Sequence, residues 1–184
     1  MIGRIFRRDR DSGAARDLYG RIVAAARQPA FYRELGVPDS IDGRFEMIAL
    51  HLFLVLHRLK QAGEPAAAAL AQALFDMAFA DMDASLREMG AGDLGVGRRV
   101  KQMATGFYGR AAAYEEGLAG AAGLEEALRR NLYGTIDPTP AELAAMARYL
   151  RAAVESLARQ PAAALGQGRV DFPAIVLPAS SSVS

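Results

Sequence analysis

The sequence predicts an all-α fold, an irregular single-domain helical bundle with a short extended C-terminal segment. Its 184 residues match the length of one domain. Hydrophobic residues, many of them Ala and Leu, make up 52% of the chain, which suits a sizeable core and helix formation. Apolar residues recur at helical spacing, and strand-like alternation is absent from the helical part.

Composition divides the chain into three expected parts. Residues 1–13 are basic and form a flexible N-terminal head, and residues 14–165 form the helical domain. Residues 166–184 form an extended tail with a disordered, serine-rich end. The apolar part of this tail is expected to lie against the bundle.

The first helix is expected over Ala14–Gln28, because apolar residues recur there at helical spacing and Pro29 then ends it. A short helical turn follows at Phe31–Leu35. The second helix is expected to end near Ala62, before Gly63. Its N-cap candidates are Asp39, Ser40 and Asp42. Apolar residues lie on nearly all sides of this helix, which predicts a buried position at the middle of the bundle.

The third and fourth helices are expected over Pro65–Met89 and Val96–Leu118. The loop between them, Gly90–Gly95, matches G-x-G-x-x-G, but a dinucleotide site needs a preceding strand, so a turn between helices is favoured. The predicted core faces hold Phe75, Phe79, Met82 and Leu86 in the third helix and Val96, Val100, Met103, Phe107, Tyr114 and Leu118 in the fourth.

A shorter helix is expected over Leu124–Leu132, and a long one follows it. Thr139 and Glu142 have the spacing of a capping box, with Pro140 at the first helical position. This is the clearest helix start in the sequence, and the helix is expected to run to about Arg159.

Charge and composition exclude several classes of function. The 22 basic and 21 acidic residues leave a net charge of +1, which argues against DNA binding because phosphate neutralisation needs excess Lys and Arg. The absence of Cys removes disulfides and Cys-based metal sites. No apolar run reaches the roughly 20 residues that span a bilayer. We therefore expect no cofactor, no metal site and no catalytic residues.

The two histidines and the acidic residues of the third helix are the candidates for a metal site. His51 and His57 are six residues apart and so cannot form the i, i+4 pair that binds zinc. Asp76 and Asp83 share a helix face, but a metal site would need convergent partners such as Glu115. An i, i+4 ion pair between Asp83 and Arg87 is the favoured interpretation.

The basic head has two open interpretations. It can be a solvated tail, or an amphipathic stub that touches anionic lipid through basic and aromatic residues. The membrane-contact candidates are Arg4, Phe6, Arg7 and Arg8.

An ordered series of short motifs resembles the ubiquinol–cytochrome c chaperone family of alpha-proteobacteria and mitochondria, over roughly residues 29–114. The motifs are Pro29-Ala30-Phe31-Tyr32, Gly36-Val37-Pro38-Asp39, Asp42-Gly43-Arg44-Phe45, Leu50-His51-Leu52-Phe53-Leu54, Asp81-Met82-Asp83, Leu86-Arg87-Glu88-Met89-Gly90, Gly92-Asp93-Leu94 and Phe107-Tyr108-Gly109-Arg110. The resemblance implies a binding protein, not an enzyme. It implies an assembly chaperone that binds newly made cytochrome b during biogenesis of the ubiquinol–cytochrome c reductase (bc1) complex.

The resemblance also implies where the protein works and with what. A small partner protein and the ribosome are further candidate partners, because mitochondrial members act with both. The head does not read as a transit peptide. A bacterial cytoplasmic protein at the inner face of the membrane, with peripheral membrane contact, is therefore expected.

The third and fourth helices combine acids, bases, methionines and aromatic residues, as a chaperone surface would. The predicted neighbourhood of partner contact is Asp81, Asp83, Arg87, Glu88, Arg98, Lys101, Phe107, Tyr108 and Arg110. Two alternatives stay open. One is a membrane- or ribosome-surface adaptor without chaperone activity, driven by the basic head and by Arg98, Arg99 and Lys101. The other, ranked last, is a helical enzyme with an acidic metal site around residues 76–83.

Overall fold

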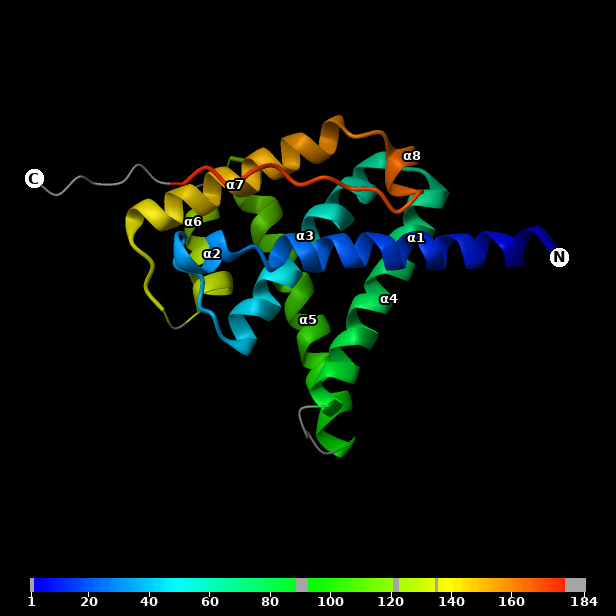
Figure 1. The fold of residues 1–184 in the computed structure, drawn as a ribbon, viewed down its shortest axis with the longest axis horizontal. Coiled ribbons are helices and arrows are strands. Elements are labelled where there is room, and N and C mark those ends of the chain that lie inside the picture. Colours follow the sequence, from blue (N-terminus) through cyan, green and yellow to red (C-terminus); the bar gives the residue numbers. More distant parts are fainter. Residues whose placement is uncertain (1, 89–92, 121–122, 135, 178–184) are drawn as a thin grey trace, which may run out of the picture.

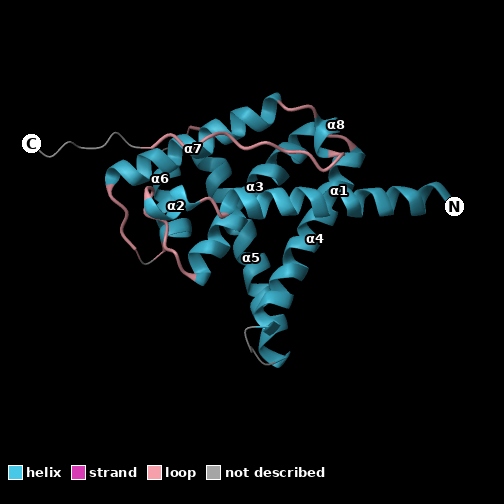
Figure 2. Cartoon of the chain, in the orientation of Figure 1, coloured by secondary structure: helices cyan, strands magenta, loops and turns pink. Residues whose placement is uncertain are grey.

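The computed structural model describes residues 2–88, 93–120, 123–134 and 136–177, with the backbone alone at residues 2–11, 86 and 93–100. Every regular element in these ranges is helical (Figure 2), which confirms the predicted all-α fold. The elements are α1 (Ile2–Ala26), α2 (Pro29–Arg33), α3 (Ile41–Ala62), α4 (Pro65–Glu88), α5 (Asp93–Leu118), α6 (Leu124–Leu128), the π-helix η1 (Arg129–Tyr133), α7 (Pro140–Arg159) and α8 (Ala162–Leu165).

Helix α3 lies at the centre of the bundle and packs against α1, α4, α7 and η1, as the sequence predicts. Ser40 is the N-cap among the three candidates, because its hydroxyl accepts a hydrogen bond from Gly43 N at 3.1 Å. Gly43 is required there, since a Cβ at this position would lie 2.0 Å from the carbonyl oxygen of Pro38. Gly63, at φ 69°, ends the helix.

His51 is fully buried in α3 and has a partner for both ring nitrogens. Nδ1 lies 2.8 Å from the carbonyl oxygen of Met47, which can only accept, so Nδ1 carries the proton. Nε2 therefore accepts from the Tyr149 hydroxyl of α7, also at 2.8 Å. The rings of Phe31 and Phe172 contact the same imidazole edge-on. This histidine is a satisfied core residue that joins α3 to α7.

The C-terminal segment is extended and runs back along α7 (Figure 1). Val170 is buried and Phe172 packs against the core, which confirms that the apolar part of the tail lies on the bundle. Gln160 fixes its start, donating to the carbonyl oxygen of Asp171 and accepting from the Asp171 N–H. The serine-rich end lies outside the described residues.

Two helices start earlier than the sequence predicts. Helix α1 begins at Ile2 instead of Ala14, so the expected head continues the helix, and its free part extends beyond the body (Figure 1). Glycine at position 13 weakens a helix by about 1 kcal/mol but does not end it, and no proline interrupts residues 2–26. Helix α5 begins at Asp93 instead of Val96.

The other predicted boundaries hold closely. Thr139 accepts from Glu142 N while the Glu142 carboxylate accepts from Thr139 N, which confirms the capping box. The predicted helix over Leu124–Leu132 is present, but its second half, Arg129–Tyr133, is a π-helix. None of the helices described here combines the length and the apolarity needed to cross a bilayer.

The burial of His51 predicts a specific loss of stability in acid. Burial lowers the pKa of His51 to about 4 from an ordinary value of 6.5. Between these values the unfolded chain binds a proton that the folded chain does not, so the free energy of unfolding falls as pH drops from about 6.5 to 4. The loss attributable to this one group is on the order of 3 kcal/mol.

Urea unfolding from pH 7 to pH 4 measures this loss. We expect His51→Gln to be less stable than the wild type at pH 7, with the gap narrowing as pH falls. His57→Gln is the matched control, because it keeps His51 and should keep the acid-dependent loss. Parallel profiles for His51→Gln and the wild type would contradict the assignment.

Candidate partner-binding site

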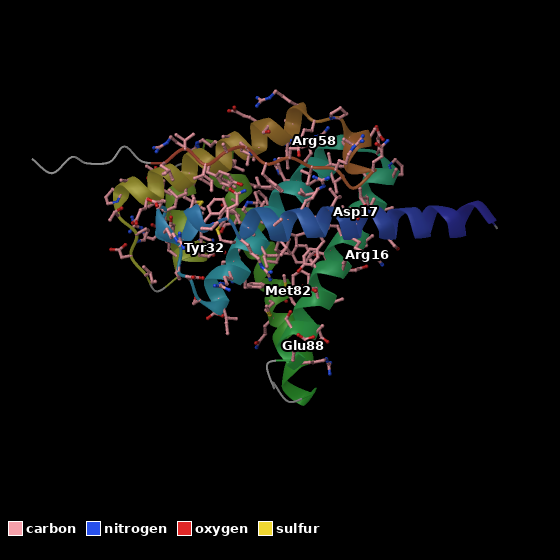
Figure 3. The ribbon with its side chains drawn as sticks, in the orientation of Figure 1. Arg16, Asp17, Tyr32, Arg58, Met82 and Glu88 are labelled. Atoms are coloured by element: carbon pink, nitrogen blue, oxygen red, sulfur yellow. The ribbon has the colours of Figure 1, made fainter. Side chains whose placement is uncertain are left out.

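Helices α4 and α5 form a limb that leaves the rest of the bundle (Figure 1). The base of the limb is fixed because α4 packs against both α1 and α3. Figure 3 shows Met82 on the part of α4 near the body and Glu88 toward its free end. All of the predicted partner-contact residues lie on these two helices.

An aromatic cluster joins the two helices of the limb. Phe75 of α4 stacks on Tyr108 of α5 with ring centroids 5.4 Å apart, and Phe79 and Phe107 extend the cluster inward. Tyr108 is 63% exposed, whereas Phe107 is 3% exposed. Phe107 is therefore a core residue, and Tyr108 is the aromatic side chain that a partner can reach.

The charged residues of the limb are mostly exposed. Asp83 Oδ2 accepts from Arg87 Nε at 2.7 Å, which confirms the predicted i, i+4 pair. Glu88 and Lys101 are also exposed, and the side chain of Arg98 lies outside the described residues. An exposed pair of this kind contributes below about 1 kcal/mol to stability, so these residues are available for a partner.

Two of the predicted residues, Asp81 and Arg110, lie on the side of the limb that faces α1 and α3. The Asp81 carboxylate accepts from the Tyr19 hydroxyl of α1 at 2.8 Å. Arg110 Nη2 donates to Glu46 Oε1 of α3 at 2.5 Å. Both residues line a pocket of about 920 Å³ between α1, α3, α4, α5 and η1. The predicted neighbourhood is thus split between the outer limb and this pocket.

The Glu46–Arg110 pair forms a polar part of the pocket wall. Gly106 gives the guanidinium room, since a Cβ there would lie 2.7 Å from Arg110 Nη1. A Cβ at Gly109, by contrast, would meet no atom within 4 Å. Burial raises the pKa of Glu46 to about 7, against the lowering effect of Arg110.

Three polar atoms of this wall are buried without a hydrogen-bond partner in the described chain. They are Glu46 Oε2, Arg110 Nε and Asn131 Nδ2. Each unmade hydrogen bond costs on the order of 1–3 kcal/mol. Glu46 and Asn131 were missed at the sequence level. The available signal was Glu46 itself, a carboxylate directly before the apolar middle of the central helix.

The remaining candidates have other roles. Asp76 accepts from Gln72 and Glu115 accepts from Lys60, so they do not converge on a metal, and no group of three metal-binding side chains occurs in the part of the chain that is described. His57 lies 3.3 Å from Glu115. A helix, α4, precedes the glycine-rich loop, as the sequence indicated. The membrane candidates Arg4, Phe6, Arg7 and Arg8 lie on the helical backbone of α1, and their side chains are outside the description.

Known proteins resemble this chain in sequence and in fold. A family model described as ubiquinol-cytochrome C chaperone matches residues 33–172. The crystal structure of the Cbp3 homolog from Brucella abortus is 40% identical, with a TM-score of 0.81. The match covers 95% of this chain and 98% of that one. No curated protein matches the chain.

The burial of Glu46 predicts a pH dependence opposite to that of His51. Its folded-state pKa lies above the ordinary 4.5, so the folded state holds the proton more tightly. The resulting stabilisation is complete below pH 4.5 and is lost as pH rises through about 7. The Glu46→Gln variant lacks this term. As the pH rises from 4.5 to 7, the free energy of unfolding of the wild type should therefore fall relative to that of Glu46→Gln, by on the order of 2–3 kcal/mol.

Urea unfolding of the wild type and of Glu46→Gln across this pH range measures the difference. Arg110→Met is a second test. The guanidinium lowers the pKa of Glu46, so removing it should move the pH-dependent loss of stability to higher pH. A constant difference between Glu46→Gln and the wild type would show that Glu46 titrates as it does in the unfolded chain.

Proposed function

The chain belongs to the ubiquinol–cytochrome C chaperone family, and we propose that it promotes assembly of the bc1 complex by binding newly made cytochrome b. In this proposal the protein binds its partner and catalyses no reaction. It works in the bacterial cytoplasm at the inner face of the membrane, where a newly made membrane protein would meet it.

The exposed limb is the observation that carries the proposal. A chaperone for a membrane protein needs a surface that is apolar at its centre and polar around it. Tyr108 supplies a large, exposed ring on a rigid aromatic base, because Phe75 stacks beneath it. Asp83, Arg87 and Lys101 supply charges on the same two helices. Tyrosine and arginine are common among the residues that dominate protein interfaces.

A second candidate function is an adaptor at the membrane or ribosome surface. The observation that favours it is the helical backbone of α1 through residues 2–13. On this helix Ile2, Ile5 and Phe6 share one side by their spacing, with arginines between them. Strong dependence of binding on salt, lost on trimming residues 1–10, would favour this function.

Affinity capture tests the chaperone proposal. We expect the tagged protein, taken from its native host during cytochrome b synthesis, to carry cytochrome b in excess over other abundant membrane proteins by mass spectrometry. Tyr108→Ala should reduce the captured amount about tenfold, since truncating a central interface aromatic commonly has this effect. Val176→Ala is the matched control, an exposed apolar residue away from the limb. Capture of ribosomes or lipid alone would support the adaptor instead.

Charge reversal separates an interface role from a folding role. We expect Asp83→Lys with Arg98→Asp to weaken capture of cytochrome b while changing the free energy of unfolding by below about 1 kcal/mol, because the exposed Asp83–Arg87 pair contributes little to stability. Thermal melting measures the second quantity. An unfolded variant would show that these residues serve the fold and would remove them from the proposed surface.

A further inference from the structure

The pocket of about 920 Å³ at the base of the limb has no part in the surface proposed above. It is walled by the start of α3, by the faces of α1, α4 and α5 that turn toward each other, and by η1 with the residues that follow it. Five segments that are far apart in the sequence therefore line one pocket.

The rim of the pocket exposes large apolar side chains. Ile41 is 65% exposed and Ile136 is 47% exposed, and both line the pocket. Deeper in the wall lie Met82 of α4 and Met103 of α5, whose flexible thioether side chains adapt to apolar ligands of different shapes. Covering these two isoleucines with an apolar ligand would remove their side chains from water, which favours binding.

The charges around the pocket are of both signs. Arg27 and Arg130 are exposed and form no ion pair within the described ranges. Asp42 and Asp81 are also exposed and also lack an ion pair there. An anionic lipid headgroup or a nucleic acid would favour a cluster of positive charges alone. A polypeptide suits this mixture, because its flanking side chains carry either charge and its backbone both donates and accepts hydrogen bonds.

The polar wall also argues against an acyl chain as the occupant. The Glu46–Arg110 pair leaves buried hydrogen-bonding capacity beside the hollow. These polar atoms are already shielded from water, and an acyl chain has no group that could hydrogen-bond to them. A peptide segment brings its own amide groups.

We propose that this pocket binds an apolar polypeptide segment flanked by polar residues, with Ile41 and Ile136 contacting its apolar side chains. This inference rests on the proposed function, in which such a segment belongs to the client. It places a second contact on the side of α4 and α5 that faces α1 and α3, separate from Tyr108, which does not line the pocket.

Peptide titration tests the pocket directly. The probe is a dye-labelled peptide with a short run of leucine and phenylalanine between lysine and aspartate, added to the full chain and followed by fluorescence anisotropy. Ile41→Asp with Ile136→Asp should raise the dissociation constant about tenfold or more. Val176→Asp with Leu177→Asp is the matched control, since these apolar residues are similarly exposed but lie outside the pocket. Equal affinity for both variants would overturn the proposal.

A cysteine label gives a second readout that does not depend on the aspartate variants folding. The chain has no cysteine, so Ile136→Cys accepts a single polarity-sensitive dye. We expect the peptide to shift its emission to shorter wavelength, and Val176→Cys to show no shift. A shift produced by vesicles of phosphatidylglycerol, and not by the peptide, would assign the pocket to lipid and overturn the proposal.

Capture of cytochrome b distinguishes a failure of the pocket proposal from a failure of the proposed chaperone function. If the wild type and the Ile41→Asp, Ile136→Asp variant capture cytochrome b equally, the pocket proposal fails and the proposed function stands. If the wild type captures none, the proposed function fails, and the peptide titration still decides whether the pocket binds polypeptide.

Discussion

The middle of helix α3, from Ala49 to Val55, is buried on all sides, and the rest of the bundle is arranged around that constraint. A helical segment with no solvent-facing side must satisfy every polar group it carries. His51 meets this requirement through Met47 within the helix and through Tyr149 of α7. The same imidazole is covered by Phe31 and by Phe172 of the C-terminal segment. One histidine therefore fixes α7 and the tail on the central helix.

Glu46, five residues before His51 in α3, meets the same requirement less completely. Glu46 is paired with Arg110, but one oxygen of the carboxylate and one nitrogen of the guanidinium remain without partners in the described structure. The core around His51 is fully satisfied, whereas the wall around Glu46 keeps unmet hydrogen bonds beside a pocket. Incomplete satisfaction of this kind is rare among buried polar groups. The same helix therefore carries a fully satisfied histidine and, five residues away, a carboxylate with unmet hydrogen-bonding capacity beside the pocket.

The sequence predicted the candidate site only in part. It predicted the two helices of the limb, because apolar residues recur at helical spacing in both. It grouped Asp81 and Arg110 with Tyr108, although the structure turns them toward α1 and α3. It counted Phe107 as a contact residue, although its ring is buried. Which side of a helix faces a neighbour depends on helices elsewhere in the chain, and no local pattern specifies that.

The sequence by itself determined the all-helical class, the capping box at Thr139, the stop at Gly63 and the Asp83–Arg87 pair, because each arises from residues within about one helical turn of each other. Only the tertiary structure decided the hydrogen bond from Tyr149 to His51, which spans 98 positions, and the Glu46–Arg110 pair, which spans 64. It also decided the pocket between five segments. These features depend on how helices cross, and crossing is set by the packing of whole helix surfaces.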